Sequence, residues 1–253
     1  MTVQLAVGAR SDVGMIRSGN EDNFFAEANE QRGVFMVADG MGGHAAGEVA
    51  SEMAVQIVSR HLLAITSVRD TGAADKVAHA LKEANRAIYE RMLAEIDKQG
   101  MGTTASVLML SDNEFLIGQI GDSRVYMLRD GALTQVTKDH SYVQEQVDAG
   151  LLTPEQARYH PYSNVITRCV GASDTVEADI YHGEARAGDV FLVASDGLTG
   201  MVDDRRLQQL LLARSGPGRI VDALIQEANG RGGLDNITAI VIQVAAVDVP
   251  ASG

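Results

Sequence analysis

The chain has few of the residues that build disulfide frameworks and cysteine-rich metal sites. Its 253 residues include one cysteine, no tryptophan and four prolines. The single cysteine, Cys169, excludes an internal disulfide and a zinc site built from several cysteines, which suits a reducing compartment. The six histidines are dispersed and form no H-E-x-x-H pair, so that zinc pattern is absent as well.

Positive charge is also scarce. The chain has 21 lysines and arginines against 34 aspartates and glutamates, a formal net charge of -13. Affinity for nucleic acid or anionic membranes comes from clustered lysine and arginine, so we expect neither as a partner. No apolar run reaches the roughly 18 residues of a membrane span, and the N-terminus lacks a signal pattern. We therefore expect a cytoplasmic monomer with one domain over residues 1–253.

Glycine is concentrated in one informative stretch, VFMVADGMGGHAAGE at residues 34–48. A glycine-rich loop between a strand and a helix can cradle a phosphate, but this one matches neither G-x-G-x-x-G nor G-x-x-x-x-G-K-[ST]. A second stretch, VFLVASDGLTG at residues 190–200, has a similar plan. Both apolar runs predict buried strands, and both deliver an Asp-Gly pair, at Asp39 and Asp196. The acids therefore have to be explained together with the glycines.

Two further aspartates lie where strands are expected to begin. Asp22 precedes one apolar segment, and Asp235 opens the run DNITAIVIQV. The end of one antiparallel strand lies beside the start of the next, so all four acids can meet at one edge of a β-sandwich. Two carboxylates about 4 Å apart repel by roughly 4 kcal/mol at an effective dielectric of 20. Either their pKa values rise or a cation binds, and an oxygen-only ligand set favours Mg²⁺ or Mn²⁺ over zinc.

The remaining pattern predicts an α+β fold. Apolar residues at three-and-four spacing predict amphipathic helices over residues 47–65 and around 77–92. Two more helices are expected to begin near Asp203 and near Pro217. Helices that cover packed antiparallel sheets give a layered α+β arrangement.

Residues 139–171 differ from the rest, because few strong apolar positions anchor them. A short helix is expected over residues 142–148, and TPEQ at residues 153–156 is typical of a capping box with proline at the first helical position. We predict that this segment is a mobile surface flap. Just before it, Asp130-Gly131 lies between two alternating segments and predicts a hairpin turn, so it is an Asp-Gly pair without chemistry.

Six motifs occur in order along the chain. They are RSGNEDN at residues 17–23, VADGMGGH at 37–44, GTTA at 102–105, GDSRVY at 121–126, SDGLTG at 195–200 and DNITAIV at 235–241. Together they resemble the metal-dependent protein phosphatases of type 2C in their compact bacterial form. The resemblance implies a central antiparallel β-sandwich flanked by α-helices on both sides, four layers in the order αββα. It also implies a serine/threonine phosphoprotein phosphatase in which a metal-bridging hydroxide attacks phosphorus directly.

The resemblance implies a site for two Mg²⁺ or Mn²⁺ ions, with a third in bacterial members. The matching residues are Glu21, Asp22, Asp39, Gly40, Asp122, Asp196 and Asp235. Asp39 would bridge the two core ions, and the carbonyl of Gly40 would bind the second. Asp196 and Asp235 would hold the first ion, and the Glu-Asp pair at the start of the set would act mainly through metal-bound waters. Asp122 and Asp196 match the acids of the third site.

Two residues are assigned to the substrate by the same resemblance. Arg17 would grip the phosphate, a role that suits the planar guanidinium group with its several donors. His44 is the candidate general acid, although eukaryotic members place their histidine directly after the Asp-Gly pair, where Met41 stands here. A solvent-facing loop histidine remains the alternative for His44, and a simple strand bulge remains the alternative for Asp122.

Two other functions remain open. A catalytically inactive member of the family could act as a phosphoprotein-binding scaffold, but such a protein would be expected to have lost some of the acids that are present here. An ATPase or kinase that used the glycine loop would need the phosphate-binding lysine and the glycine spacing of a nucleotide-binding motif, and the loop has neither. The expected partners are phosphorylated proteins, together with a cognate serine/threonine kinase and its substrates. We place substrate selectivity in the flap at residues 139–171.

Overall fold

The apolar runs of the sequence form two antiparallel sheets in the computed structural model, which describes residues 3–43, 45–213 and 215–247. The first sheet has the strand order β1-β11-β10-β7-β8. Its strands are β1 (Val3–Asp12), β7 (Arg124–Arg129), β8 (Ala132–Gln135), β10 (Val190–Ala194) and β11 (Ile237–Val247).

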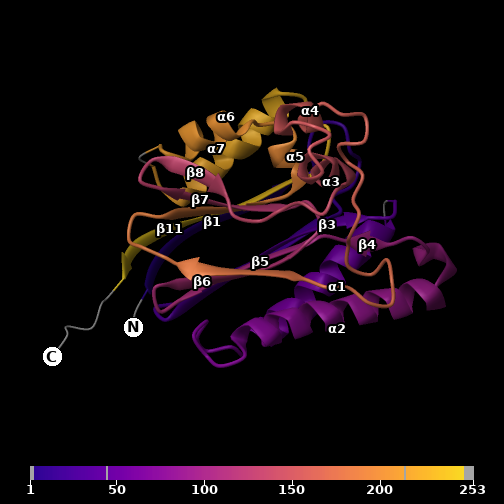
Figure 1. Ribbon diagram of the computed structural model, residues 1–253, viewed down its shortest axis with the longest axis horizontal. Coiled ribbons are helices and arrows are strands. Elements are labelled where there is room, and N and C mark those ends of the chain that lie inside the picture. Colours follow the sequence, from indigo (N-terminus) through magenta and orange to yellow (C-terminus); the bar gives the residue numbers. More distant parts are fainter. Residues whose placement is uncertain (1–2, 44, 214, 248–253) are drawn as a thin grey trace.

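The second sheet has the order β2-β3-β5-β6-β9, and β4 pairs with β3 outside that path. Its strands are β2 (Asp22–Ala28), β3 (Arg32–Met41), β4 (Gly102–Thr103), β5 (Ala105–Ser111), β6 (Glu114–Ile120) and β9 (Asp179–Glu184). The two sheets lie against each other, as Figure 1 shows.

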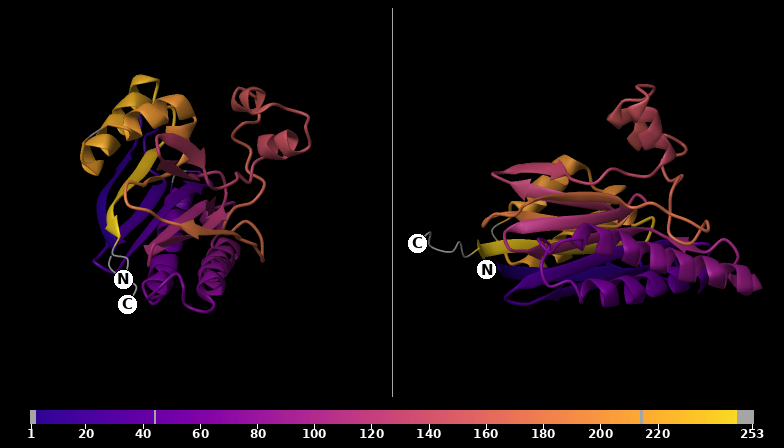
Figure 2. Two further views of the ribbon diagram at one scale, coloured as in Figure 1. Left: turned by 60° about the vertical axis from the view of Figure 1, so that its left-hand side comes forward. Right: turned by 60° about the horizontal axis from the view of Figure 1, so that its bottom comes forward.

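Helices cover the outer face of each sheet (Figures 1 and 2). The second sheet carries α1 (Ala45–Leu62) and α2 (Ala73–Ala94), with the 3-10 turn η1 (Ile96–Lys98) after them. The first sheet carries α5 (Asp196–Thr199), α6 (Asp204–Leu211) and α7 (Pro217–Gly230). The helix starts predicted near residues 203 and 217 are confirmed, with Asp203 as the side-chain cap of α6 and Pro217 in the first turn of α7. Within the described ranges, no helix is both long and apolar enough to cross a membrane.

The alternation of side chains along β3 shows why its apolar run is continuous. Val34, Met36 and Ala38 belong to the core that the second sheet forms with α1 and α2. Phe35 and Val37 point the other way and belong to the core between the two sheets. The strand β10 is divided in the same manner between the inter-sheet core and the core beneath α6 and α7. The four-layer αββα fold expected from the sequence is therefore confirmed.

The apolar run FLIGQIGDSRVYML at residues 115–128 is broken at Gly121-Asp122, as its sequence indicates, because the chain crosses there from one sheet to the other. β6 ends at Ile120 in the second sheet, and β7 begins at Arg124 in the first. Gly121 lies at this crossover with φ +100°, and a Cβ there would come within 2.6 Å of the Thr104 side chain. Only glycine satisfies the turn and the close approach together, so the crossover positions the next residue, Asp122.

The segment 139–171 contains two short helices, α3 (Tyr142–Asp148) and α4 (Pro154–Arg158), and projects from the sandwich (Figure 2). The capping box is present, because the Thr153 hydroxyl accepts from the backbone of Gln156 and the Gln156 side chain accepts from the backbone of Thr153. The hairpin predicted at Asp130-Gly131 joins β7 to β8 and is also confirmed. That residues 139–171 move as a flap stays a prediction.

Candidate metal and phosphate site

The strand ends bring the four predicted aspartates together. Asp22 and Asp39 are direct partners across the antiparallel pair β2–β3. Asp196 follows β10 and Asp235 precedes β11, and these two strands are antiparallel neighbours as well. The acids therefore come from both sheets and meet at one end of the sandwich, close enough that Asp196 and Asp235 both raise the pKa of Asp22.

Burial and mutual repulsion make these carboxyl groups weak acids. Burial raises the pKa of Asp22 to about 7, even though the Ser195 hydroxyl donates to it over 2.8 Å. Burial also raises the pKa of Asp39 well above its usual value, and the charges of Asp22, Asp196 and Asp122 add to the shift. The side-chain contact between Asp39 and Asp196 adds to the rise in the pKa of Asp39 and opposes the rise in the pKa of Asp196 that burial causes. The cluster carries more carboxyl groups than its surroundings can keep charged.

Asp122 is the fifth acid of the cluster. It is 6% exposed, and its pKa is raised by burial and by the charges of Asp196 and Asp139. One carboxyl oxygen of Asp122 and one of Asp22 are buried without a hydrogen-bond partner in the described part of the chain. Buried polar atoms are almost always satisfied, so these two oxygens suit a cation that would bind between the acids.

Arg17 lies beside the cluster and forms an ion pair with one of its members. Its Nη2 atom is 2.7 Å from Oδ2 of Asp235, and the two side chains are 50% and 36% exposed. The family resemblance implies that Arg17 binds the phosphate and Asp235 a metal, and the structure places the two side chains in direct contact. Either role requires the pair to open or to share its charges with a ligand.

In the ranges that the structure describes, no three carboxylate, imidazole or thiol groups form a ready-made metal cage. The contacts just described account for this. Asp235 faces Arg17, and the Asp39 and Asp196 side chains contact each other, so several oxygens that would face an ion are held by other partners. The donor set itself, carboxylate oxygens with the Gly40 carbonyl, fits a hard divalent cation. The metal roles of these residues stay predictions.

Gly40, Gly47 and Glu21 pack too closely for any side chain at the two glycines. A Cβ on Gly40 would come within 2.2 Å of the Gly47 carbonyl, and one on Gly47 would come within 1.9 Å of Oε2 of Glu21. The Gly40 N–H donates to the carbonyl of Glu21 over 3.1 Å. The glycine-rich stretch thus brings α1 against the Glu21 loop, beside Asp39. His44 lies outside the described residues, and its role stays a prediction.

Asn236 holds the loop that carries Arg17 and Glu21. Its Nδ2 atom donates to the carbonyls of Val13 and Gly19, and its Oδ1 atom accepts from the N–H of Glu21. Three backbone groups of one loop are therefore fixed by a single side chain that is 5% exposed. Nothing in the sequence alone points to this role, although Asn236 stands next to Asp235 in the DNITAIV motif.

Asn236→Ala is expected to destabilise the protein by about 2–3 kcal/mol, because it leaves buried backbone groups unsatisfied. It is also expected to lower kcat/KM about tenfold or more, because the Arg17 loop loses its position. Thermal unfolding and phosphate-release kinetics measure the two effects. Asn29→Ala is the matched control: its Oδ1 atom accepts from Gln31 and Arg32 in the turn at the opposite end of the β2–β3 hairpin. A kcat/KM equal to that of the control would contradict the positioning role.

Residues with hydroxyl side chains also position the acids. Thr104 exchanges hydrogen bonds with the Asp39 backbone through its Oγ1 atom and its N–H, and its hydroxyl is 2.8 Å from that of Ser123. Ser195 is fixed by the N–H of Thr238 over 3.0 Å while it donates to Asp22. The sequence alone predicts none of these contacts, and the signal for them is the place of the three residues inside the GTTA, GDSRVY and SDGLTG motifs.

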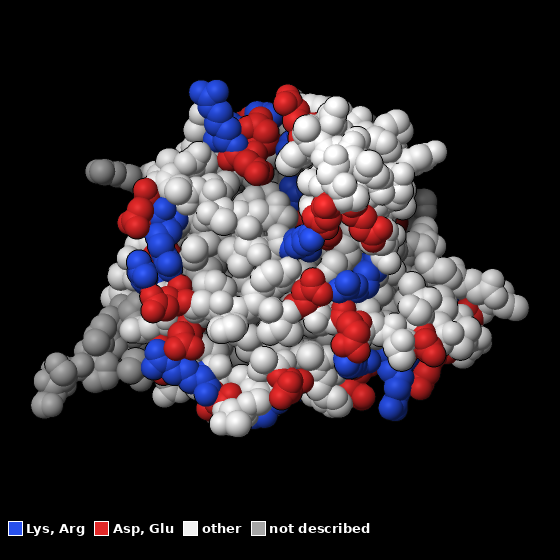
Figure 3. All heavy atoms as spheres, in the orientation of Figure 1, with Lys and Arg blue, Asp and Glu red and all other residues white. Residues whose placement is uncertain are grey.

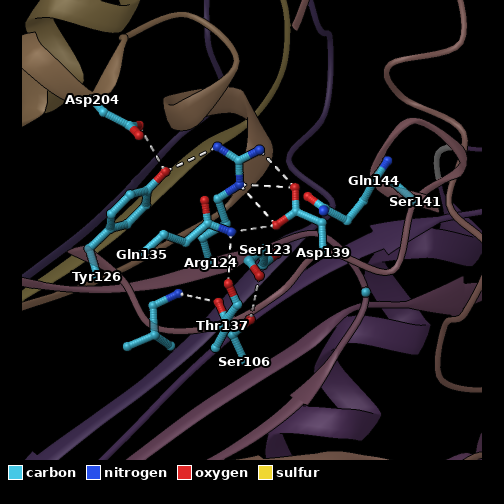
Figure 4. A network of polar contacts seen from close by, with 12 residues as sticks. Ser106, Ser123, Arg124, Tyr126, Gln135, Thr137, Asp139, Ser141, Gln144 and Asp204 are labelled. Carbon is cyan, nitrogen blue, oxygen red and sulfur yellow. Dashed lines mark hydrogen bonds and ion pairs between the residues drawn. The ribbon is translucent and has the colours of Figure 1, made fainter. Parts of the chain in front are cut away.

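A partly buried ion pair between Arg124 and Asp139 anchors the start of the segment 139–171 (Figure 4). The Arg124 guanidinium donates from Nε and Nη2 to Asp139, with the shortest contact at 2.7 Å. Burial alone would lower the pKa of Arg124, but Tyr126 and Asp139 outweigh it and raise that pKa. Arg124 also lowers the pKa of Asp122, so it supplies permanent positive charge at the edge of the cluster.

Comparison with known proteins gives one consistent result. A family model described as Protein phosphatase 2C matches residues 16–219. The serine/threonine protein phosphatase PstP of Mycobacterium tuberculosis is 40% identical over 248 residues, which are 98% of this chain and 46% of that protein. The serine/threonine phosphatase Stp of Listeria monocytogenes is 36% identical over 236 residues, 92% of this chain and 94% of that protein. The chain thus spans about half the length of PstP.

A solved structure matches at the level of the fold and carries metal. It is the catalytic domain of PstP in complex with two manganese ions, with a TM-score of 0.86 and 38% sequence identity. The match covers 97% of this chain and 100% of that one.

Proposed function

Because the chain belongs to the protein phosphatase 2C family, we propose that it hydrolyses phosphoserine and phosphothreonine in proteins with two Mg²⁺ or Mn²⁺ ions bound. The single observation that supports this best is the cluster of buried carboxyl groups with raised pKa values and two unpartnered oxygens. Such a cluster is stabilised most when a divalent cation replaces the protons on its carboxyl groups.

The ligands we propose follow the family resemblance. Asp39 would bridge the two ions, the Gly40 carbonyl would bind one of them, and Asp196 and Asp235 would hold the other. Glu21 and Asp22 would act mainly through metal-bound waters, and Asp122 and Asp196 would hold a third ion. When bound, the ions supply a water of lowered pKa for direct attack on phosphorus and positive charge that offsets the phosphate.

The protein's own groups orient the reaction in this proposal. Arg17 leaves Asp235 to the metal and turns its donors to the phosphate oxygens, which accept planar bidentate hydrogen bonds well. Asn236 keeps the Arg17 loop in place, and Ser195 orients the Asp22 carboxylate. His44 is proposed to protonate the leaving oxygen of the serine or threonine.

Arg17→Ala is expected to lower kcat/KM about 10- to 100-fold, mainly through KM, because charge-assisted hydrogen bonds to the phosphate are lost. The affinity for Mn²⁺ should not fall, since Asp235 loses a competing cation. Steady-state kinetics at several Mn²⁺ concentrations measure both quantities. Arg10→Ala is the control, because Arg10 forms an exposed ion pair of the same length, 2.7 Å, with Asp222. Unchanged kcat/KM in Arg17→Ala would refute the phosphate role.

The proposed partners are phosphorylated proteins, a cognate serine/threonine kinase and that kinase's substrates. On the face shown in Figure 3, lysine and arginine side chains are interspersed with aspartate and glutamate rather than gathered into one basic surface. Together with the net charge of -13, this supports a phosphate ligand bound locally rather than an extended polyanion. We propose that the segment 139–171 contributes to the choice of substrate.

A further inference from the structure

Four exposed apolar residues lie on two loops next to Arg17 and Asp235. Val13, Met15, Ile16 and Leu234 are 38%, 66%, 67% and 56% exposed. They are four of the thirteen large apolar side chains that are exposed in the described part of the chain. Single exposed apolar residues need no explanation, but a group beside a reaction site points to a contact with a ligand. We call these four residues the loop patch.

The two loops of the patch are fixed to each other. The Met15 N–H donates to the carbonyl of Gly233 over 2.8 Å. A Cβ on Gly14 would come within 2.3 Å of the Asp235 carbonyl, and one on Gly233 within 2.8 Å of the Met15 side chain. Both glycines have positive φ, so the backbone approach depends on them. The patch is thus part of the same packed unit as Arg17 and Asp235.

Chain geometry limits what this patch can contact. Consecutive Cα atoms are about 3.8 Å apart, so Met15 lies within roughly 7.6 Å of Arg17 from Cα to Cα. An extended peptide rises about 3.3 Å per residue, and the side chains of residues i and i+2 point to the same face. A residue two positions from a phosphorylated residue therefore lies about 7 Å away and on the same side. The guanidinium group of Arg17 contacts Asp235, which directly follows Leu234 of the patch, so a side chain at this spacing can reach the patch from a phosphate that Arg17 holds.

From this placement, we propose that the loop patch binds an apolar side chain two positions from the phosphoserine or phosphothreonine of the substrate. The inference rests on the phosphate position assigned to Arg17 in the proposed function. The patch adds affinity for the protein segment that flanks the phosphate and takes no part in the chemistry. Phosphosites with leucine, methionine or phenylalanine at that position are favoured over sites with serine there.

The test uses five phosphothreonine peptides. Four carry a single leucine, placed one or two residues before or after the phosphothreonine, and the fifth is a reference that has serine at all of these positions. Binding is measured by fluorescence anisotropy with a non-hydrolysable phosphonate in place of the phosphate, so the result does not depend on turnover. The double variant Met15→Ser with Leu234→Ser is expected to bind one of the two-position leucine peptides about tenfold more weakly, and the serine reference unchanged. Met15→Leu with Leu234→Met should bind like the wild type.

Kinetics separate this inference from the function on which it rests. With Mn²⁺, acetyl-phosphothreonine amide, which has no flanking side chain, should be hydrolysed equally by the wild type and the double variant. If the wild type failed to hydrolyse this compound, the result would count against the proposed function. The peptide binding ratios would still show whether the patch binds an apolar side chain. Leu212→Ser, at an exposed leucine that follows α6, is the control. If the ratio of leucine-peptide affinity to reference affinity were the same in the wild type and the double variant, the proposal for the patch would be overturned and selectivity would be left to residues 139–171. A double variant that changed only its oligomeric state would overturn the proposal in the same way.

Discussion

Replacing Asp39 with asparagine is expected to lower kcat about a thousandfold or more without unfolding the protein. The bridging carboxylate of the proposed metal site is lost, and about 4 kcal/mol of stabilisation of the transition state corresponds to three powers of ten. The fold should survive, because the pKa of Asp39 is already raised by burial and by its acidic neighbours. The asparagine amide can donate a hydrogen bond to Asp196 and carries no charge that the neighbouring carboxylates repel. The metal-free variant should therefore be at least as stable as the metal-free wild type.

The chain offers its own control for this substitution. Asp130 also precedes a glycine, but it lies in the β7–β8 hairpin with φ 50°, a conformation that asparagine tolerates well. Asp130→Asn should leave kcat unchanged and stability within about 0.5 kcal/mol of the wild type. Kinetics with saturating Mn²⁺ and thermal unfolding in a chelator measure the two variants. Near-normal turnover or metal affinity in Asp39→Asn would refute its assigned role.

The sequence predicts the convergence of the acids because strand direction decides it. An aspartate after one strand and an aspartate before its antiparallel neighbour must lie at the same end of a sheet. This reasoning places Asp22 beside Asp39, as the register of β2 and β3 shows. The apolar periodicity likewise predicts the helices, since it depends only on local spacing.

The sequence does not predict contacts that depend on how loops pack. The pairing of Arg17 with Asp235 requires the approach of residues 14 and 233, and nothing in the pattern reveals that approach. The clamp by Asn236 and the bonds from Thr104 and Ser195 are also tertiary contacts between segments far apart in the chain. The passage of residues 115–128 between the two sheets follows from Gly121, whose positive φ cannot be read from its neighbours.

Removal of the metal is expected to weaken the folded protein as the pH rises. The pKa of Asp22 is raised from 3.8 to about 7, and the pKa values of Asp39, Asp122 and Asp196 are raised in the same direction by burial. Between pH 4 and 7 the folded metal-free chain therefore binds more protons than the unfolded chain, so its stability falls as the pH increases through that window. A bound cation offsets this loss.

Added Mn²⁺ should restore stability increasingly as its concentration rises above its dissociation constant. At 100 times its dissociation constant, a ligand that binds only the folded state contributes about 2.7 kcal/mol, which raises Tm by roughly 5–10 °C in a protein of this size. Thermal unfolding at pH 5 and pH 8, with Mn²⁺ or with a chelator, measures the effect. The rise in Tm should be larger at pH 8, and a rise that is larger at pH 5 would show that the buried acids do not hold the ions.

The acid cluster is expected to bind divalent cations for phosphate hydrolysis, and removal of the metal is the decisive test of that role. Phosphate release from a phosphothreonine peptide is followed on metal-free protein as Mn²⁺ is added and then removed with a chelator. The predicted result is activity that rises at least about a thousandfold with Mn²⁺ and is lost again in the chelator. Activity indifferent to the chelator would contradict the metal mechanism, and tight binding of the phosphopeptide without turnover would identify a scaffold instead of an enzyme.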